Sequence, residues 1–166
     1  MFCIYEILCI KCRYLVKSGR KWEKMFFGQY HHSIDDKNRL MIPRKMRDEA
    51  GVKLFIMKGY EGSISVYKAS EFEKLEQKLE SLSYTQKKYR DFIRGVLASA
   101  CELDVDKAGR IQIPTYFMSK YNMGKDVMVI GAGNHFEIWN TDAYQAYEDN
   151  LDSTFESVAE NLFSEE

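Results

Sequence analysis

Proline and glycine are scarce in this chain: only two of its 166 residues are prolines and ten are glycines. This scarcity excludes a collagen-like or linker-dominated protein. No stretch reaches the roughly 18 apolar residues that a membrane-spanning helix needs, so we expect a soluble protein. Because 45% of the residues are apolar, the chain can bury a core. Its length suits one domain or two very small ones.

Cysteine is sparse and clustered. Cys3, Cys9 and Cys12 lie close to the N-terminus, whereas Cys101 stands alone. A Cys-x-x-Cys pair can hold zinc or carry redox chemistry, but no second pair and no neighbouring histidine completes a zinc-binding set. We interpret these residues as incidental thiols in a reducing compartment, with no disulfide framework.

Recognisable catalytic motifs are also missing. Asp35 and Asp36 lie beside cations in a predicted turn, which is typical of a structural cap more than of a general acid. His31 and His32 are adjacent in a predicted strand, so they point to opposite faces and cannot easily share a metal ion. The sequence therefore predicts no catalytic residue, no metal site, no cofactor and no small-molecule substrate.

The segment Gly131-Ala132-Gly133-Asn134 could be a phosphate-binding loop or a hairpin turn. A phosphate-binding loop needs the N-terminus of a following helix. The residues after Asn134 have the pattern of a strand, so we predict a hairpin.

Charge is distributed unevenly, although the net charge is only -1. Residues 1–24 carry a net charge of +4, residues 25–141 carry +3, and residues 142–166 carry -8 without one basic side chain. A modestly basic body with an acidic tail is compatible with nucleic-acid binding.

An internal repeat organises the middle of the chain. Pro43 and Pro114 are 71 residues apart, and each follows the same pattern of Asp, Arg four residues later, an apolar residue, Ile and Pro. Further on, Gly59 matches Gly131 with an offset of 72 residues. Agreement over some 40 residues is a true repeat rather than chance.

Each repeat has the predicted order strand, turn, strand, short helix, strand, strand. One such unit buries too little apolar area to stand alone, so two copies should pair about a pseudo-twofold axis and share one core. The predicted class is α+β. Strands are expected at 29–34, 39–42, 53–58, 63–67, 100–105, 110–113, 126–130 and 135–139, and helices at 44–50, 71–82, 85–98, 115–122, 141–150 and 153–163.

The two repeated turns carry the candidate site. In each turn an aspartate can accept backbone amides, and a residue that tolerates positive φ precedes an arginine. The arginine fork suits phosphate or guanine edges. The predicted turn-structuring residues are Asp35, Asn38, Asp106 and Gly109, and the predicted DNA-binding residues are Arg39, Lys37, Arg110 and Lys107.

Two segments resemble signatures of the bacterial MraZ family. MFFGQY at residues 25–30, with HSIDDKNRLMIP at residues 32–43, resembles the family's opening, and IGAGNHFEIW at residues 130–139 resembles its second-half signature. The resemblance covers residues 25 to about 147. One departure is Asn38, where a glycine is usual; asparagine also tolerates the left-handed conformation.

The resemblance implies a fold similar to the AbrB/SpoVT swapped-hairpin, or double-split, β-barrel, built here from two β-β-α-β-β units in one chain. It implies a transcriptional regulator that binds double-stranded DNA upstream of its own division and cell-wall gene cluster, mainly as a repressor. It also implies a ring-shaped homo-oligomer, often an octamer, in the cytoplasm and on the nucleoid.

We expect the first repeat with its helix at residues 25–83, the second at 84–150, and an acidic helical tail at 151–166. Residues 1–24 lie outside the resemblance, and we expect them to be non-native or translated from upstream, with Met25 as the natural start. Their codons permit two G-rich strings about ten base pairs apart, so this segment could be translated operator DNA.

Two other classes of function stay open. One is a ring-forming interaction scaffold without specific DNA binding. The other is an enzyme or effector-binding domain that uses the Gly131 hairpin. A steep dependence of DNA binding on salt would separate a DNA-binding regulator from the scaffold, because phosphate contacts release counterions.

Overall fold

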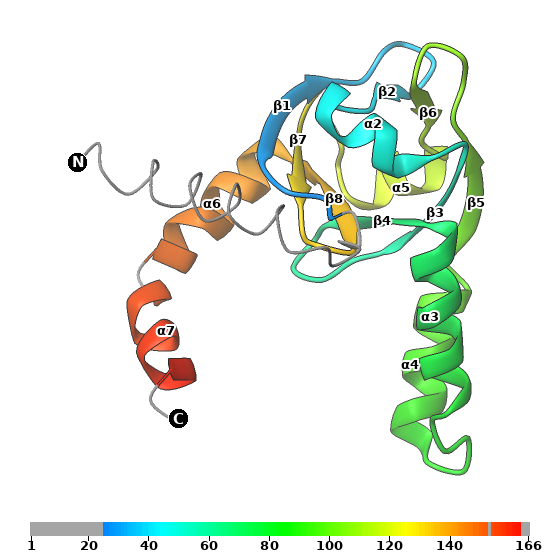
Figure 1. Cartoon of the computed structure of the whole chain (residues 1–166), viewed down its shortest axis with the longest axis vertical. Helices are drawn as coiled ribbons and strands as arrows, with labels where there is room; N and C mark the ends of the chain where they lie inside the picture. The colour runs from blue at the N-terminus through cyan, green and yellow to red at the C-terminus, as the bar shows by residue number, and fades with distance from the viewer. Residues whose placement is uncertain (1–24, 153, 164–166) are drawn as a thin grey trace, which may run out of the picture.

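The computed structural model describes residues 25–152 and 154–163 (Figure 1). The extension at residues 1–24 lies outside the described residues. The strands are β1 (Gln29–Ser33), β2 (Arg39–Met41), β3 (Lys53–Lys58), β4 (Ile64–Lys68), β5 (Cys101–Asp104), β6 (Arg110–Gln112), β7 (Asp126–Gly131) and β8 (His135–Asn140). The helices are α2 (Arg44–Ala50), α3 (Ala69–Glu80), α4 (Lys87–Leu97), α5 (Thr115–Lys120), α6 (Thr141–Asp152) and α7 (Phe155–Phe163).

Strands are exchanged between the two repeats. The first strand of each repeat pairs with the third strand of the other, β1 with β7 and β5 with β3. The two second strands pair with each other, as do the two fourth strands, β4 and β8. All of these pairings are antiparallel, and the pattern is unchanged when the repeats are interchanged, as a pseudo-twofold relation requires.

The structure has the predicted α+β class. The strands do not pair into the closed β-barrel that the family resemblance implied. Six strands form one sheet in the order β1-β7-β8-β4-β3-β5, which leaves β1 and β5 as its edges, and β2 and β6 form a separate two-stranded ribbon. Each ribbon strand has only three residues and pairs with the other ribbon strand. Beyond that, an isolated bridge joins Leu40 of the ribbon to Ile34, the residue directly after β1.

The main core lies between the ribbon and one face of the sheet. Strand alternation brings Val66 of β4 and Phe136 of β8 to this face, where they are fully buried. Leu40 of β2 and Ile111 of β6 are opposite each other in the ribbon and belong to the same core, with no exposed surface. The ribbon therefore presents one face to the core and the other to solvent.

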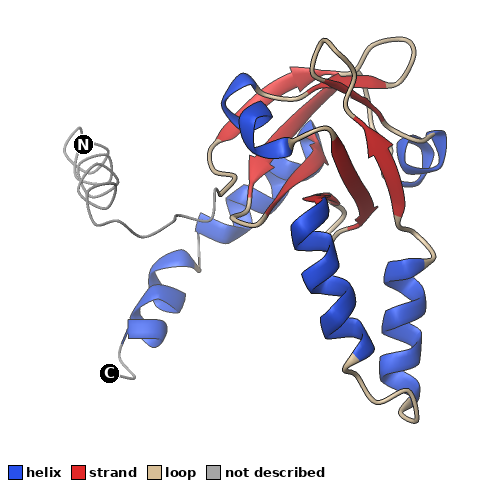
Figure 2. Cartoon of the chain, turned by 45° about the vertical axis from the view of Figure 1, so that its right-hand side comes forward, coloured by secondary structure: helices blue, strands red, loops and turns tan. Residues whose placement is uncertain are grey.

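Helices cover the other face of the sheet. Phe72 of α3 stacks on Phe55 of β3 with ring centroids 4.4 Å apart, and Val96 of α4 joins the same buried cluster. Tyr147 of α6 packs on Trp139 of β8 at 5.0 Å. From there, α3 with α4 and α6 with α7 project away from the sheet as two separate arms (Figures 1 and 2).

Element boundaries follow local chemistry. Helices α2 and α5 begin directly after Pro43 and Pro114, as predicted. Helix α5 ends at Lys120, two residues earlier than predicted, because Asn122 takes a positive φ of 47° that an α-helix cannot continue. In the described part of the chain, every helix is too short or too polar to cross a bilayer.

The buried ribbon residue Leu40 gives a test of this core. We expect Leu40→Ala to lower the free energy of unfolding by about 2–5 kcal/mol, because it removes apolar contact and leaves a cavity. Val52→Ala is the matched control, since Val52 is 77% exposed, and it should change stability little. Urea unfolding followed by circular dichroism measures both; equal effects would contradict the assigned core.

Candidate nucleic-acid interface

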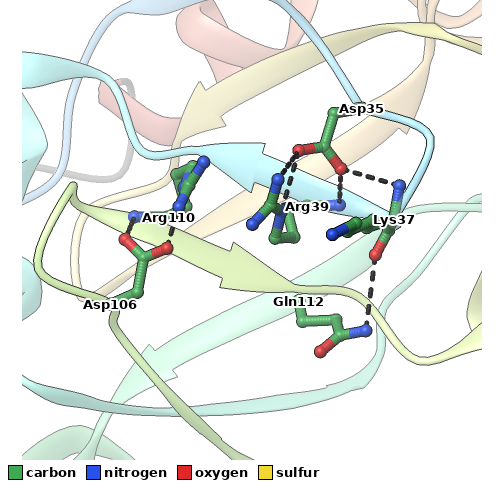
Figure 3. A network of polar contacts seen from close by, with 6 residues as sticks. All are labelled: Asp35, Lys37, Arg39, Asp106, Arg110 and Gln112. Carbon is green, nitrogen blue, oxygen red and sulfur yellow. Dashed lines mark hydrogen bonds and ion pairs between the residues drawn. The ribbon is translucent and has the colours of Figure 1, made fainter.

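The first repeated turn is held by one carboxylate. Asp35 Oδ1 accepts the backbone N–H groups of Lys37 at 2.9 Å and Arg39 at 3.0 Å. Its Oδ2 accepts Arg39 Nε at 2.8 Å and lies 2.7 Å from Nη2. Asn38 occupies the left-handed position, with a φ of 58°. The same aspartate therefore fixes both the turn backbone and the arginine side chain (Figure 3).

The second turn repeats this geometry. Asp106 Oδ1 accepts the backbone N–H groups of Ala108 at 2.8 Å and Arg110 at 3.0 Å, and Oδ2 accepts Arg110 Nε at 2.7 Å. Gly109 has a φ of 80°, in the place of Asn38. Two segments of different sequence thus form the same Asp–Arg turn.

Each turn is also bonded to the other repeat. The carbonyl oxygen of Asn38 accepts the backbone N–H of Ile113 at 2.8 Å, and that of Gly109 accepts the N–H of Ile42 at 3.0 Å. These two bonds continue the ribbon ladder past its ends. The turns therefore lie at opposite ends of one rigid ribbon.

The outer face of the ribbon carries the candidate arginines. Arg39 is opposite Gln112, and Met41 is opposite Arg110. These four side chains alternate with the buried residues, so they share the solvent face. The Arg39 and Arg110 side chains keep 31% and 32% of their surface exposed, despite their ion pairs. The structure thus brings the two predicted arginines onto one face (Figure 3).

The two predicted lysines are both exposed but are not equivalent. Lys37 lies two residues after its aspartate, and Lys107 lies one residue after its own. The carbonyl of Lys37 accepts the side-chain amide of Gln112 at 3.3 Å. The second turn lacks the extra carboxylate that Asp36 brings to the first, so it is the more positive of the two.

Arg47 is a cation at this interface that the sequence reasoning missed. From α2, it lines a surface hollow of about 400 Å³ together with Lys107 and Gly109. Its Nε donates to the carbonyl of Ile42 at 2.8 Å. A Cβ on Gly109 would lie 2.9 Å from Arg47 Cδ, so the Arg47 side chain would have to shift to admit one. The sequence spacing gives no signal for this contact, because only the fold joins α2 to the second turn.

Electrostatics reinforce the turns. The hydrogen bond from the Arg39 side chain lowers the pKa of Asp35 to about 2, and the turn amides add to this effect. The backbone N–H of Arg110 is the main cause that lowers the pKa of Asp106. The pKa of Arg39 is raised by the same bond to Asp35. Both aspartates are therefore charged at neutral pH.

The histidines, the cysteine and the glycine hairpin that the sequence analysis considered lie outside the two Asp–Arg turns. His31 is exposed while His32 is half-buried, on opposite faces of β1. Burial raises the pKa of the Cys101 thiol. Gly131 ends β7 and leads into the hairpin to β8, and a Cβ there would lie 2.3 Å from the backbone nitrogen of Phe27. The hairpin prediction is confirmed, and this glycine serves the close approach of the N-terminal segment.

Comparisons with known proteins agree with the repeat. The sequence model of the family described as "MraZ protein, putative antitoxin-like" matches residues 25–95 and again residues 96–165. The chain belongs to the MraZ family. The two MraZ repeats supply the exchanged strands and one Asp–Arg turn each.

Relatives resemble the chain over most of its length. The "Transcriptional regulator MraZ" of Syntrophomonas wolfei is 40% identical over 138 residues, which are 83% of this chain and 96% of that protein. The protein of the same name from Caldanaerobacter subterraneus is 41% identical with the same coverage. The solution structure of PHS018 from Pyrococcus horikoshii matches 69% of this chain and 97% of its own, at 14% identity and a TM-score of 0.31.

The low pKa of Asp35 predicts how the first turn responds to acid. Because the folded-state pKa of about 2 is below the ordinary value of 3.8, the ionised carboxylate favours the folded turn. The contribution of the ionised carboxylate to the stability of the folded turn should be complete above about pH 4. It should be lost as the pH falls through about 2. An NMR titration of the Asp35 carboxyl carbon measures this; a midpoint near 4 would contradict the turn geometry.

Proposed function

We propose that this protein is a sequence-specific DNA-binding transcriptional regulator that reads DNA with the β2–β6 ribbon. The observation that carries the proposal is the solvent face of the ribbon, which presents Arg39 and Arg110 from two pseudo-symmetric turns. The names of the relatives, which are transcriptional regulators, support the same conclusion.

The ribbon has a suitable shape for the major groove. That groove admits a two-stranded β-ribbon, and guanine offers two acceptors there that an arginine fork can meet. Asp35 bonds Nε and Nη2 of Arg39, and a guanidinium carries five N–H donors, so donors remain for a base. An arginine held in one orientation by a carboxylate loses less conformational entropy on binding than a free one.

Lys37, Lys107 and Arg47 would contact phosphates beside the ribbon. All three flank the turns, and such contacts position a protein on DNA without reading its sequence. Asp35 and Asp106 offset part of this positive charge, so one protomer should bind DNA weakly.

Assembly of several protomers would compensate for weak single contacts. A ring that repeats the same ribbon can engage tandem boxes at once, and effective concentration then raises the affinity. We propose that the protein acts in this way as a ring oligomer on the upstream region of its own gene cluster, mainly as a repressor, in the cytoplasm and on the nucleoid. If the purified protein fails to bind the upstream DNA, the alternative function, an interaction scaffold without DNA specificity, is favoured instead.

We further propose residues 25–83 and 84–150 as the two structural repeats and residues 151–166 as a separate acidic tail. The exchanged pairings of β1 and β5 support the assignment of the strand arrangement to the swapped-hairpin class.

Arg39 tests the base-reading role. Arg39→Ala should abolish specific binding to the upstream DNA and leave the oligomer intact, because a lost bidentate contact costs about 1–3 kcal/mol in each engaged protomer. Fluorescence anisotropy with the upstream DNA and light scattering measure the two properties. Lys78→Ala is the control and should bind normally, because Lys78 is an exposed residue of α3 that lies outside the ribbon and its turns. Unchanged binding by an intact Arg39→Ala oligomer would contradict the proposal; Arg110→Ala tests the second turn in the same way.

Asp35 should act indirectly. Asp35→Ala frees the Arg39 side chain and loosens the turn, so it should weaken binding without removing a phosphate contact. The slope of log affinity against log salt should then stay nearly unchanged, whereas Lys37→Ala should reduce it by about one. Anisotropy titrations at several salt concentrations compare them. A slope for Asp35→Ala that falls as far as that of Lys37→Ala would argue against a turn-holding role.

A further inference from the structure

The C-terminal arm exposes an apolar stripe with acidic surroundings. Phe155 and Val158, one helical turn apart in α7, are 63% and 52% exposed, and Leu151 of α6 is 42% exposed. Glu156 and Glu160 lie on the same helix, and residues 142–166 contain no basic side chain. Since α7 extends beyond the sheet (Figures 1 and 2), the sheet and helices at residues 25–152 leave this stripe exposed.

The other arm contains an apolar groove of about 200 Å³. It lies between α4 and the turn that joins β3 to β4. Met57 and Val96 form buried parts of its wall, while Tyr60 and Phe92 are 63% and 41% exposed. The lining residues are Met57, Lys58, Gly59, Tyr60, Asp91, Phe92, Gly95 and Val96.

The helix beside this groove is net positive, although the charged residues of the lining itself are Lys58 and Asp91. Helix α4 carries four basic residues and one acidic residue, Asp91. Asp91 is shared by Lys87 at 2.6 Å and Arg94 at 3.9 Å, so one carboxylate faces two cations. Lys88 lies four residues before Phe92, on the same helix face. Net positive charge therefore lies along α4, next to the exposed ring of Phe92.

Gly95 keeps the groove open. It lies inside α4, where glycine costs about 1 kcal/mol relative to alanine. Among the described residues, a Cβ at this position would meet nothing within 4 Å, and its φ is not positive. Packing within the described part of the chain and backbone conformation therefore do not require a glycine here, but the close approach of another helix would.

We propose that α7 of one copy docks into the α4 groove of a second copy. The acidic, apolar helix α7 complements an apolar groove that is bordered by the net-positive helix α4. This proposal rests on the ring assembly of the proposed function and names the surfaces that would build it.

The contact is head-to-tail, because the groove and the helix belong to different arms of one chain. Each copy then offers one groove and one helix, so the interaction closes into a ring or continues as an open chain. The ribbon takes no part in it, and each protomer keeps its DNA-binding face.

The experiment uses two variants of the full chain that each remove one side of the contact. Phe155→Asp places a charge on the docking helix and keeps the groove. Gly95→Leu fills the groove, keeps the helix and improves the helix propensity of α4. We expect each variant alone to shift to monomer in light scattering, with a dissociation constant for self-association raised at least about tenfold.

Mixing the two variants gives the decisive result. The intact helix of the Gly95→Leu copy should dock into the intact groove of the Phe155→Asp copy, which produces a 1:1 complex that cannot grow further. This complex also shows that both variants are folded. Phe27→Asp is the matched control, because Phe27 is 68% exposed and lies outside both surfaces; it should keep the wild-type mass.

Other outcomes overturn the docking proposal. They are a monomeric wild type, wild-type mass for either variant, or a mixture that stays monomeric. Deletion of residues 1–24 should not change the number of copies in the assembly. If the assembly falls apart after this deletion, residues 1–24 and not α7 occupy the groove. The docking proposal and the DNA-binding proposal can be refuted separately. If the two variants form a 1:1 complex but the wild-type protein does not bind the upstream DNA, only the proposed function is refuted.

Discussion

The carboxylate of each repeated turn is the constraint on which the candidate interface depends. Asp35 and Asp106 each use one oxygen for two backbone amides and the other for an arginine side chain. The turn also directs a carbonyl to the opposite repeat. The carbonyl of Asn38 accepts the backbone N–H of Ile113, and the carbonyl of Gly109 accepts that of Ile42. The same small motif thus sets the turn, orients the arginine and joins the two halves of the chain.

The motif has an electrostatic consequence. An arginine paired with an aspartate contributes little net attraction for DNA, but its orientation is fixed before binding. In the proposed function, such a surface would favour sequence discrimination over nonspecific attraction to phosphate, and it would gain affinity from repetition rather than from charge. The acidic helices α6 and α7 are compatible with this, since they form an arm that projects from the sheet (Figure 1).

The fold separates two kinds of surface. Short strands β2 and β6 form a rigid ribbon above the core, whereas the helical arms grow from the opposite face of the sheet. The docking of α7 into the α4 groove that we propose would therefore leave the ribbon free.

The sequence by itself determined the repeat, the order of the elements and the residues of both turns, because these depend on local patterns: strand alternation, the two prolines, and Asn38 or Gly109 at the left-handed position. Tertiary structure decided the rest. Residues far apart in sequence create the exchange of strands, the open sheet with a separate ribbon, and the contact of Arg47 with Gly109. No local pattern encodes which edge a three-residue strand will pair with, since that choice depends on the shared core of both repeats.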